Sequence, residues 1–239
     1  MSSTQPVHIR CPRCGDRFPA QLFLNLHVTR SPESRHMILD GRFSMFDCPA
    51  CGARIRAEPT MLYSDFEKWK WYGVFPRAAL RHRGALVERL NQGFRFNLEV
   101  AAPPMVREWA PRFTRRAVFG LASLRDKLLC EDHGLDDRAL EVLKWMVLRE
   151  SAPRAIHPET DVHLHHVDGD QLALLIEPPP GPDGTVVARL LGVDRGRLAE
   201  AAGLVGKLYP DGEVVDWRAP LWPDEPLDEP LAFDDRMAL

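Results

Sequence analysis

Two short cysteine motifs near the start of the chain constrain its fold more than any other feature. A spacing of two residues lets one tight turn present both sulfurs to the same ion, and a glycine after each pair permits a positive φ that turns backbone amides toward the sulfurs. Four thiolates complete a tetrahedron around zinc and leave no position open for a catalytic water. The pattern therefore predicts one structural zinc ion per chain. The motifs are Cys11-Pro-Arg-Cys14-Gly15 and Cys48-Pro-Ala-Cys51-Gly52, and the expected ligands are Cys11, Cys14, Cys48 and Cys51.

Other uses of these cysteines fit less well. The first ten residues hold no apolar core of the kind a signal peptide needs, and no segment approaches the roughly 20 apolar residues of a membrane span. We therefore expect a cytoplasmic protein without a membrane partner, in which paired Cys-x-x-Cys motifs indicate metal ligands before disulfides. Redox catalysis would need a thioredoxin-like βαβ unit, which the pattern does not contain. Iron in a four-cysteine site stays open as an alternative.

Residues 1–76 are predicted to form a zinc-ribbon-like β domain with a short helical insert. Apolar residues alternate along 18–28, which is the period of a strand. Ser31 and Pro32 are typical of an N-cap and a first helical position, so we expect a short helix that ends near Leu39. Further strands are predicted over 42–47, over 54–57, and in a segment that ends at Pro76 and carries Trp69, Trp71 and Phe75 on one side.

The chain resembles the CpXC domain proteins of bacteria over roughly residues 7–150. The resemblance implies a zinc-ribbon-like domain with the four cysteines as metal ligands, and it implies no reaction. Besides the two cysteine motifs, it rests on Val28-Thr-Arg-Ser-Pro-Glu-Ser-Arg35, Leu39-Asp-Gly-Arg-Phe43, Leu62-Tyr-Ser-Asp65, Val118-Phe-Gly-Leu121 and Gly134-Leu-Asp-Asp-Arg138.

The middle of the chain, residues 77–154, is predicted to be helical. One helix is expected over 80–90, a short strand over 95–100, and a second helix on the stripe formed by Val118, Leu121, Leu124 and Leu128. Gly134 is placed to end that helix, and Asp136 to cap a third over 137–149. Since the third helix is apolar on most of its circumference, the last two should form a hairpin buried on more than one side.

Residues 155–219 are predicted to form a small α+β region, which makes the whole chain α+β. Asp168-Gly169 is a strong hairpin signal between strands over 162–167 and 170–177. A strand over 186–191, a helix over 195–202 and a last strand over 214–217 should follow. Residues 220–239 contain four prolines and six acids and are predicted to be an extended tail.

Charge is segregated along the chain. Residues 67–127 hold 13 Lys or Arg and 5 Asp or Glu, whereas residues 159–239 hold 6 and 17. We expect the two segments to attract each other within the fold, although a basic face for nucleic acid is the alternative. Bases and aromatics interleave in the basic part, as they do on single-strand-binding surfaces. The candidate contacts are Lys68, Lys70, Trp71, Arg115 and Arg116, unless strand alternation places the tryptophans in the core and the lysines in water.

Two further groups of side chains carry weaker signals. His163, His165 and His166 cluster on one strand, where the first two would share a face and could bind a second metal, although a solvated strand is the commoner explanation. Cys130 falls off the apolar stripe of its helix, so we expect a small, partly exposed residue. A lone thiol for which no base or nucleophile partner can be named is weak evidence for catalysis.

These features favour a non-enzymatic zinc-binding adaptor or complex subunit. The chain has no Gly-rich phosphate loop, no His-Glu-x-x-His and no Gly-x-Ser-x-Gly. Helix 137–149 and the acidic tail offer apolar surface to a protein partner. A nucleic-acid-binding module that uses residues 67–127 is the first alternative, and an enzyme with an unrecognised site in the C-terminal region is the second. The expected docking residues of the tail are Trp222, Leu227, Leu231 and Phe233.

Overall fold

The computed structural model describes residues 2–179, 181, 185–209 and 212–226 and has an α+β fold. The chain divides into two compact units. The first contains the residues up to Leu121 together with the segment that starts at Asp224, and the second runs from Ala122 to Pro223. The boundaries predicted after residues 76 and 154 lie inside these units. No helix in the described ranges is both long enough and apolar enough to cross a membrane.

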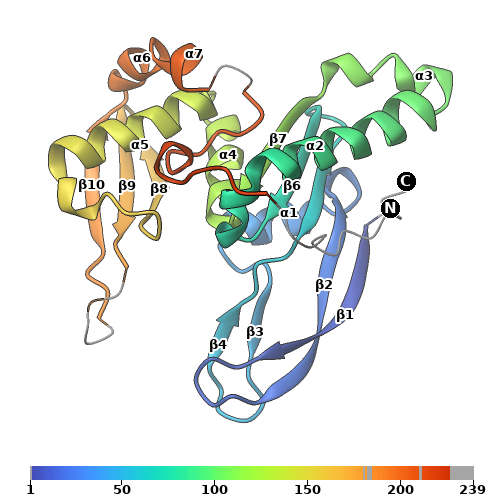
Figure 1. Ribbon diagram of the computed structural model, residues 1–239, viewed down its shortest axis with the longest axis horizontal. Helices are drawn as coiled ribbons and strands as arrows, with labels where there is room; N and C mark the ends of the chain where they lie inside the picture. The colour runs from blue at the N-terminus through green and yellow to red at the C-terminus, as the bar shows by residue number, and fades with distance from the viewer. Residues whose placement is uncertain (1, 180, 182–184, 210–211, 227–239) are drawn as a thin grey trace. The chain divides into compact units, whose positions relative to one another are not determined.

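A five-stranded mixed sheet organises the first unit (Figure 1). Its strand order is β1-β2-β5-β6-β7, with parallel pairing of β2 to β5 and of β6 to β7 and antiparallel pairing elsewhere. Every residue of β5 is buried, so this strand has protein on both faces. The pairing of β6 with β7 explains why no boundary follows residue 76. The strands are β1 (Ser3–Arg10), β2 (Arg17–His27), β5 (Met61–Asp65), β6 (Lys70–Phe75) and β7 (Thr114–Phe119).

The predicted helical insert and the strands around the second cysteine motif are present. Helix α1 (Pro32–Leu39) follows β2 and begins at the proline. Strands β3 (Met45–Asp47) and β4 (Arg54–Arg56) pair antiparallel as a separate two-stranded sheet. The second cysteine motif thus lies on a short hairpin that does not hydrogen-bond to the strands of the main sheet.

The strand predicted over residues 95–100 is wrong. Helix α2 (Arg83–Phe94) follows a 3-10 helix (Arg77–His82) and continues into a π-helical turn (Arg95–Val100), which the short helix α3 (Pro104–Arg107) follows. The side-chain Nδ2 of Asn97 donates to the backbone carbonyl of Gly93 over 2.8 Å, which supports the widened turn. The helix continues because a buried apolar residue recurs every four positions into this segment. These residues are Leu86, Leu90, Phe94 and Leu98.

Val118 lies in β7, so the prediction that it begins a helical stripe is also wrong. Gly120 separates the strand from helix α4 (Leu121–Asp132), and its φ of +95° is in the region that favours glycine. The N–H of Gly120 donates to the carbonyl of Phe75 over 2.8 Å. The rest of the stripe, from Leu121 to Leu128, is helical as expected and is buried.

Helix α5 (Asp137–Ser151) lies against a three-stranded antiparallel sheet in the second unit (Figure 1). The carboxylate of Asp136 accepts from the N–H of Arg138 over 2.9 Å, which confirms the predicted cap. The sheet has the order β10-β9-β8, and the hairpin at Asp168-Gly169 is present. The remaining elements are β8 (Asp161–Asp168), β9 (Gln171–Glu177), β10 (Arg189–Asp194), α6 (Arg197–Ala202) and α7 (Val205–Leu208).

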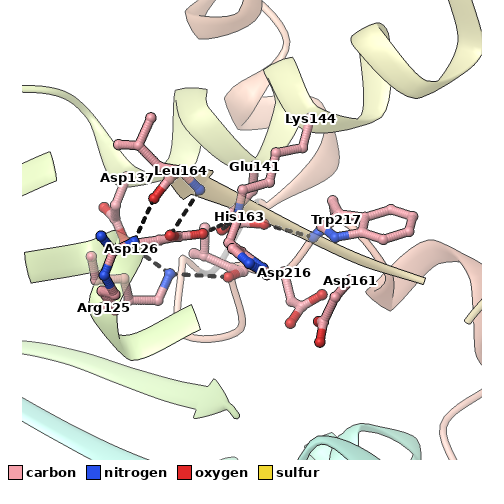
Figure 2. Close-up of polar contacts among 12 residues, drawn as sticks. Arg125, Asp126, Asp137, Glu141, Lys144, Asp161, His163, Leu164, Asp216 and Trp217 are labelled. Atoms are coloured by element: carbon pink, nitrogen blue, oxygen red, sulfur yellow. Dashed lines mark hydrogen bonds and ion pairs between the residues drawn. The ribbon is translucent and has the colours of Figure 1, made fainter. Parts of the chain in front are cut away.

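Charged side chains occupy the middle of this unit (Figure 2). Lys144 Nζ lies 2.6 Å from Asp126 Oδ2 and 2.7 Å from Glu141 Oε1, and all three residues are buried. Desolvation raises the pKa of Asp126 and of Glu141 although Lys144 opposes the shift. Desolvation would lower the pKa of Lys144, but its two carboxylate partners outweigh that effect and raise it.

The segment 214–217 does not form the strand that the sequence predicts, because its backbone bonds to side chains of this ion cluster. Only Val214 forms a bridge, because the backbone that follows bonds to charged side chains instead. The carbonyl of Val215 accepts from Lys127 Nζ over 3.1 Å, and the N–H of Trp217 donates to Glu141 Oε2 over 3.2 Å. These bonds hold the segment over the buried charges without a second strand.

Replacing Lys144 with methionine tests the cluster. Lys144→Met keeps the length of the side chain but leaves Asp126 and Glu141 buried without their cation, which should cost about 3–5 kcal/mol of unfolding free energy. Arg197→Met is the control, since Arg197 pairs with Glu150 at 2.7 Å on a more exposed surface and should cost about 0–1 kcal/mol. Urea unfolding measures both variants, and equal losses would contradict the assignment.

Candidate metal centre

The two cysteine motifs adopt the same backbone conformation. In the first, the N–H of Cys11 donates to the Asp16 carbonyl over 2.8 Å and the N–H of Gly15 to the Cys11 carbonyl over 2.9 Å. In the second, Cys48 and Gly52 make the equivalent bonds over 2.9 and 2.8 Å. The φ angles of Gly15 and Gly52 are +79° and +68°, which confirms the role expected for the glycines. The first motif connects β1 to β2, and the second connects β3 to β4.

The two turns bring all four sulfur atoms to one point. The Sγ atoms of Cys11 and Cys51 are 3.7 Å apart, as are those of Cys14 and Cys48. Every pair of the four lies within 4.8 Å. A zinc–sulfur bond of about 2.3 Å gives a tetrahedron with edges of about 3.8 Å, whereas a disulfide would need about 2.05 Å. The four cysteines are free and can hold a metal ion.

The surroundings of the sulfurs favour a bound cation. Hydrogen bonds from backbone N–H groups, that of Cys14 first, lower the pKa of Cys11 to about 7. The N–H of Asp16 also favours the thiolate of Cys14, but desolvation and the three neighbouring sulfurs outweigh it and raise that pKa to about 12. Four thiolates this close repel one another unless a cation lies between them. Cys11 and Cys48 are buried in a small core with Phe18, which limits access by water.

A family model described as "CpXC protein" matches residues 9–144, which include both cysteine motifs. The match covers more than half of the chain, and the protein belongs to this family. No curated protein and no solved structure matches the chain.

Most of the predicted nucleic-acid contacts are not arranged to stack on bases. Trp71 is 1% exposed and packs edge-on against Phe94 at 5.6 Å, so its proposed role in stacking is wrong. Arg115 lies 5.1 Å above the Phe94 ring and donates to Asn91 Oδ1 over 2.9 Å, and Arg116 donates to the carbonyl of Arg115. Lys68 is exposed and Lys70 is half-buried. All residues of β6 from Trp71 to Phe75 are buried, so the interior position of this strand, between β5 and β7, accounts for the burial of Trp71.

Trp69 occupies a position that the sequence analysis did not foresee. Its φ of +57° places it in a turn before β6 rather than in the strand. The ring contacts Trp109 and Phe113 edge-on, and the guanidinium of Arg112 lies 5.1 Å from its centroid. The only signal in the sequence was the concentration of aromatic and basic residues.

The remaining candidate residues are spread over the chain. Trp222 is half-buried, and Leu227, Leu231 and Phe233 lie outside the described residues. Cys130 is 1% exposed, so the expectation of partial exposure is wrong. It belongs to the same buried core as Ala139 and Leu143 of α5, and desolvation raises the pKa of its thiol.

Removing one sulfur tests the metal centre. Cys14→Ser should lower the metal content of dialysed protein from about one ion per chain to near zero, and it should destabilise the first unit because metal binding and folding are coupled in such modules. Cys130→Ser is the matched control, since this thiol lies outside the cluster, and it should keep its metal. Elemental analysis and thermal unfolding are the measurements. Equal metal content in the two variants would contradict the assignment.

Proposed function

We propose that the protein is a non-enzymatic adaptor or complex subunit that is held together locally by a structural zinc ion and binds another protein. Four thiolates at tetrahedral spacing support zinc, since zinc has no geometric preference of its own and accepts four sulfurs. Iron is the other metal that such a set takes. A closed four-sulfur site offers no ligand position to a substrate, so its contribution is to the fold.

Exposed apolar side chains on the segment after α2 carry the proposal of a protein partner. Phe96, Val100 and Met105 are 57%, 64% and 64% exposed. Phe96 and Val100 are one π-helical turn apart, since the N–H of Ala101 bonds to the carbonyl of Phe96 over 2.8 Å. Large apolar side chains exposed this close together are typical of interaction sites, and π-helical turns are frequent at functional positions.

The charges around this segment suggest the character of the partner. Arg95 and Arg107 are exposed on either side of the apolar residues. Glu99 and Glu108 are exposed in the same segment, so the rim is mixed in charge. An apolar centre with such a rim fits a protein partner that offers apolar anchors among charges of both signs. Helix α5, in contrast, gives no support to docking, because Leu140, Leu143 and Val147 are buried in the core of the second unit.

The acidic tail is a second element of the proposal. Asp224 Oδ1 accepts from the N–H of Gly84 over 3.1 Å, and the N–H of Glu225 donates to the Arg81 carbonyl over 2.6 Å. The start of the tail is thereby held at the beginning of α2. Acidic residues and the anchors Leu227, Leu231 and Phe233 follow in the sequence, and we propose that they contribute to docking.

Substituting the apolar residues tests the adaptor function. The double variant Phe96→Asp, Val100→Asp should lose a protein that co-purifies with the wild type from its native cells, because charge opposes burial of the contact. Val187→Asp is the control, since Val187 is 67% exposed but lies in the other unit, and it should keep that protein. The same co-purifying proteins in all three preparations would contradict the proposal.

A nucleic-acid-binding role is the first alternative. The exposed Lys68 and the pair formed by Arg112 and Trp69 are the observations in its favour. An enzyme with an unrecognised site in the C-terminal region is the other alternative.

Binding to a single-stranded oligonucleotide tests the first alternative. If the basic residues contact phosphates, affinity should fall steeply with salt, and Lys68→Ala should reduce the slope by about one. Trp71→Ala should act through stability instead, with a loss of about 3–5 kcal/mol. Fluorescence anisotropy measures the binding, and no binding at physiological salt would remove this alternative.

A further inference from the structure

Three potential metal ligands meet on one face of the sheet in the second unit. Asp161 and His163 are two residues apart on β8, so their side chains point to the same face. Glu177 on β9 pairs directly with Asp161, so it projects to that face as well. The core residues Val162, Leu164 and Ile176 occupy the opposite face. Strand register alone therefore brings two carboxylates and one imidazole together.

The spacing of the ligand atoms suits a small cation. His163 Nε2 lies 3.4 Å from Glu177 Oε2, and one ligand atom from each of the three residues lies within 4.8 Å of the others. Nitrogen and oxygen ligands about 2.1 Å from a tetrahedral ion are about 3.4 Å apart. The buried Nδ1 of His163 has no hydrogen-bond partner in the described residues, so the ring makes its polar contact through Nε2, on the carboxylate side.

We propose that Asp161, His163 and Glu177 bind a divalent transition-metal ion, at a site separate from the four cysteines. One imidazole and two carboxylates are the ligands that zinc, manganese or ferrous iron accept. Three protein ligands leave at least one position for water, in contrast to the closed four-sulfur centre. The ion is exchangeable, because the side chains of Asp161 and Glu177 are 32% and 40% exposed.

A neighbouring arginine forms an ion pair with Asp161. Arg218 Nη1 lies 3.5 Å from Asp161 Oδ1, at the limit of a hydrogen bond. The same guanidinium donates to both oxygens of Asp216, over 2.9 and 2.7 Å, and both residues are buried. The charge of Arg218 is therefore matched mainly by Asp216. The arginine serves as an outer contact that orients the Asp161 carboxylate, as is common around metal ligands.

His165 does not lie beside His163 on one face of β8, as the sequence analysis expects. A register shift between Leu164 and His166 leaves His165 outside the regular pairing, and His165 contacts His166, with Nδ1 atoms 2.8 Å apart. His163 and His165 therefore do not share a site. The ligands that join His163 are the acids at positions 161 and 177 (the Asp161 and His163 side chains are labelled in Figure 2).

Metal titration of the full-length protein separates this site from the cysteine centre. Cobalt is the probe, because a thiolate site gives intense near-ultraviolet sulfur-to-metal bands, whereas a nitrogen and oxygen site gives weak visible bands alone. The wild type should take up one cobalt ion without sulfur bands in addition to any ion that the cysteines hold. Glu177→Gln and His163→Gln should weaken that additional binding by about tenfold or more, while His165→Gln should bind as the wild type does.

A wild type that binds cobalt through sulfur alone, or binds the additional ion equally in Glu177→Gln, His163→Gln and His165→Gln, shows that the His163–Glu177 contact is a simple ion pair. Circular dichroism checks that each variant is folded. If His163→Gln does not fold, Glu177→Gln still provides the test, since the Glu177 side chain is 40% exposed. Failure of the cysteine centre would appear as missing sulfur bands and would leave the additional binding intact.

Discussion

Four sulfur atoms held within 4.8 Å of one another set the strongest constraint on the first unit. As thiolates they repel, so a cation bound at their centre would convert an unfavourable cluster into a crosslink between two distant turns. The crosslink joins the turn after β1 to the turn after β3, across 33 intervening residues. It would let the small hairpin of β3 and β4, whose own core contains little beyond Phe46 and Ile55, keep a defined position beside β1 and β2.

In the second unit, buried ion pairs and hydrogen bonds from charged side chains join segments that are distant in the chain. Lys144 lies between Asp126 and Glu141 in the core, and Lys127 and Glu141 bind the backbone around Val215 and Trp217. Buried charges of this kind add little net stability over apolar packing, but they are costly to leave unpaired, so they favour one arrangement of the segments that they join. At the edge of this cluster, Arg218 connects it to Asp161 and hence to the proposed site at His163.

The hairpin at Asp168-Gly169 and the cap at Asp136 could be predicted from the sequence, because each depends on residues close together in the chain. The grouping of the four cysteines could be predicted because two local motifs of the same Cys-x-x-Cys form indicate one shared site. The sequence did not reveal β7, whose residues pair with β6 after a separation of about 40 residues. The sequence predicts a strand over 95–100, whereas the buried stripe from Leu86 to Leu98 continues the helix and makes this segment a π-helical turn. The grouping of His163 with Asp161 and Glu177 depends on cross-strand register, which the pattern along one strand cannot specify.

The central claim is that Cys11, Cys14, Cys48 and Cys51 together hold one zinc ion. X-ray absorption at the zinc edge, on full-length protein loaded with a single equivalent of zinc, tests it most directly. Four sulfur neighbours at about 2.3 Å are expected, with no nitrogen or oxygen in the first shell. A first shell that contains fewer than four sulfurs, or nitrogen and oxygen at about 2.0–2.1 Å, would contradict the account.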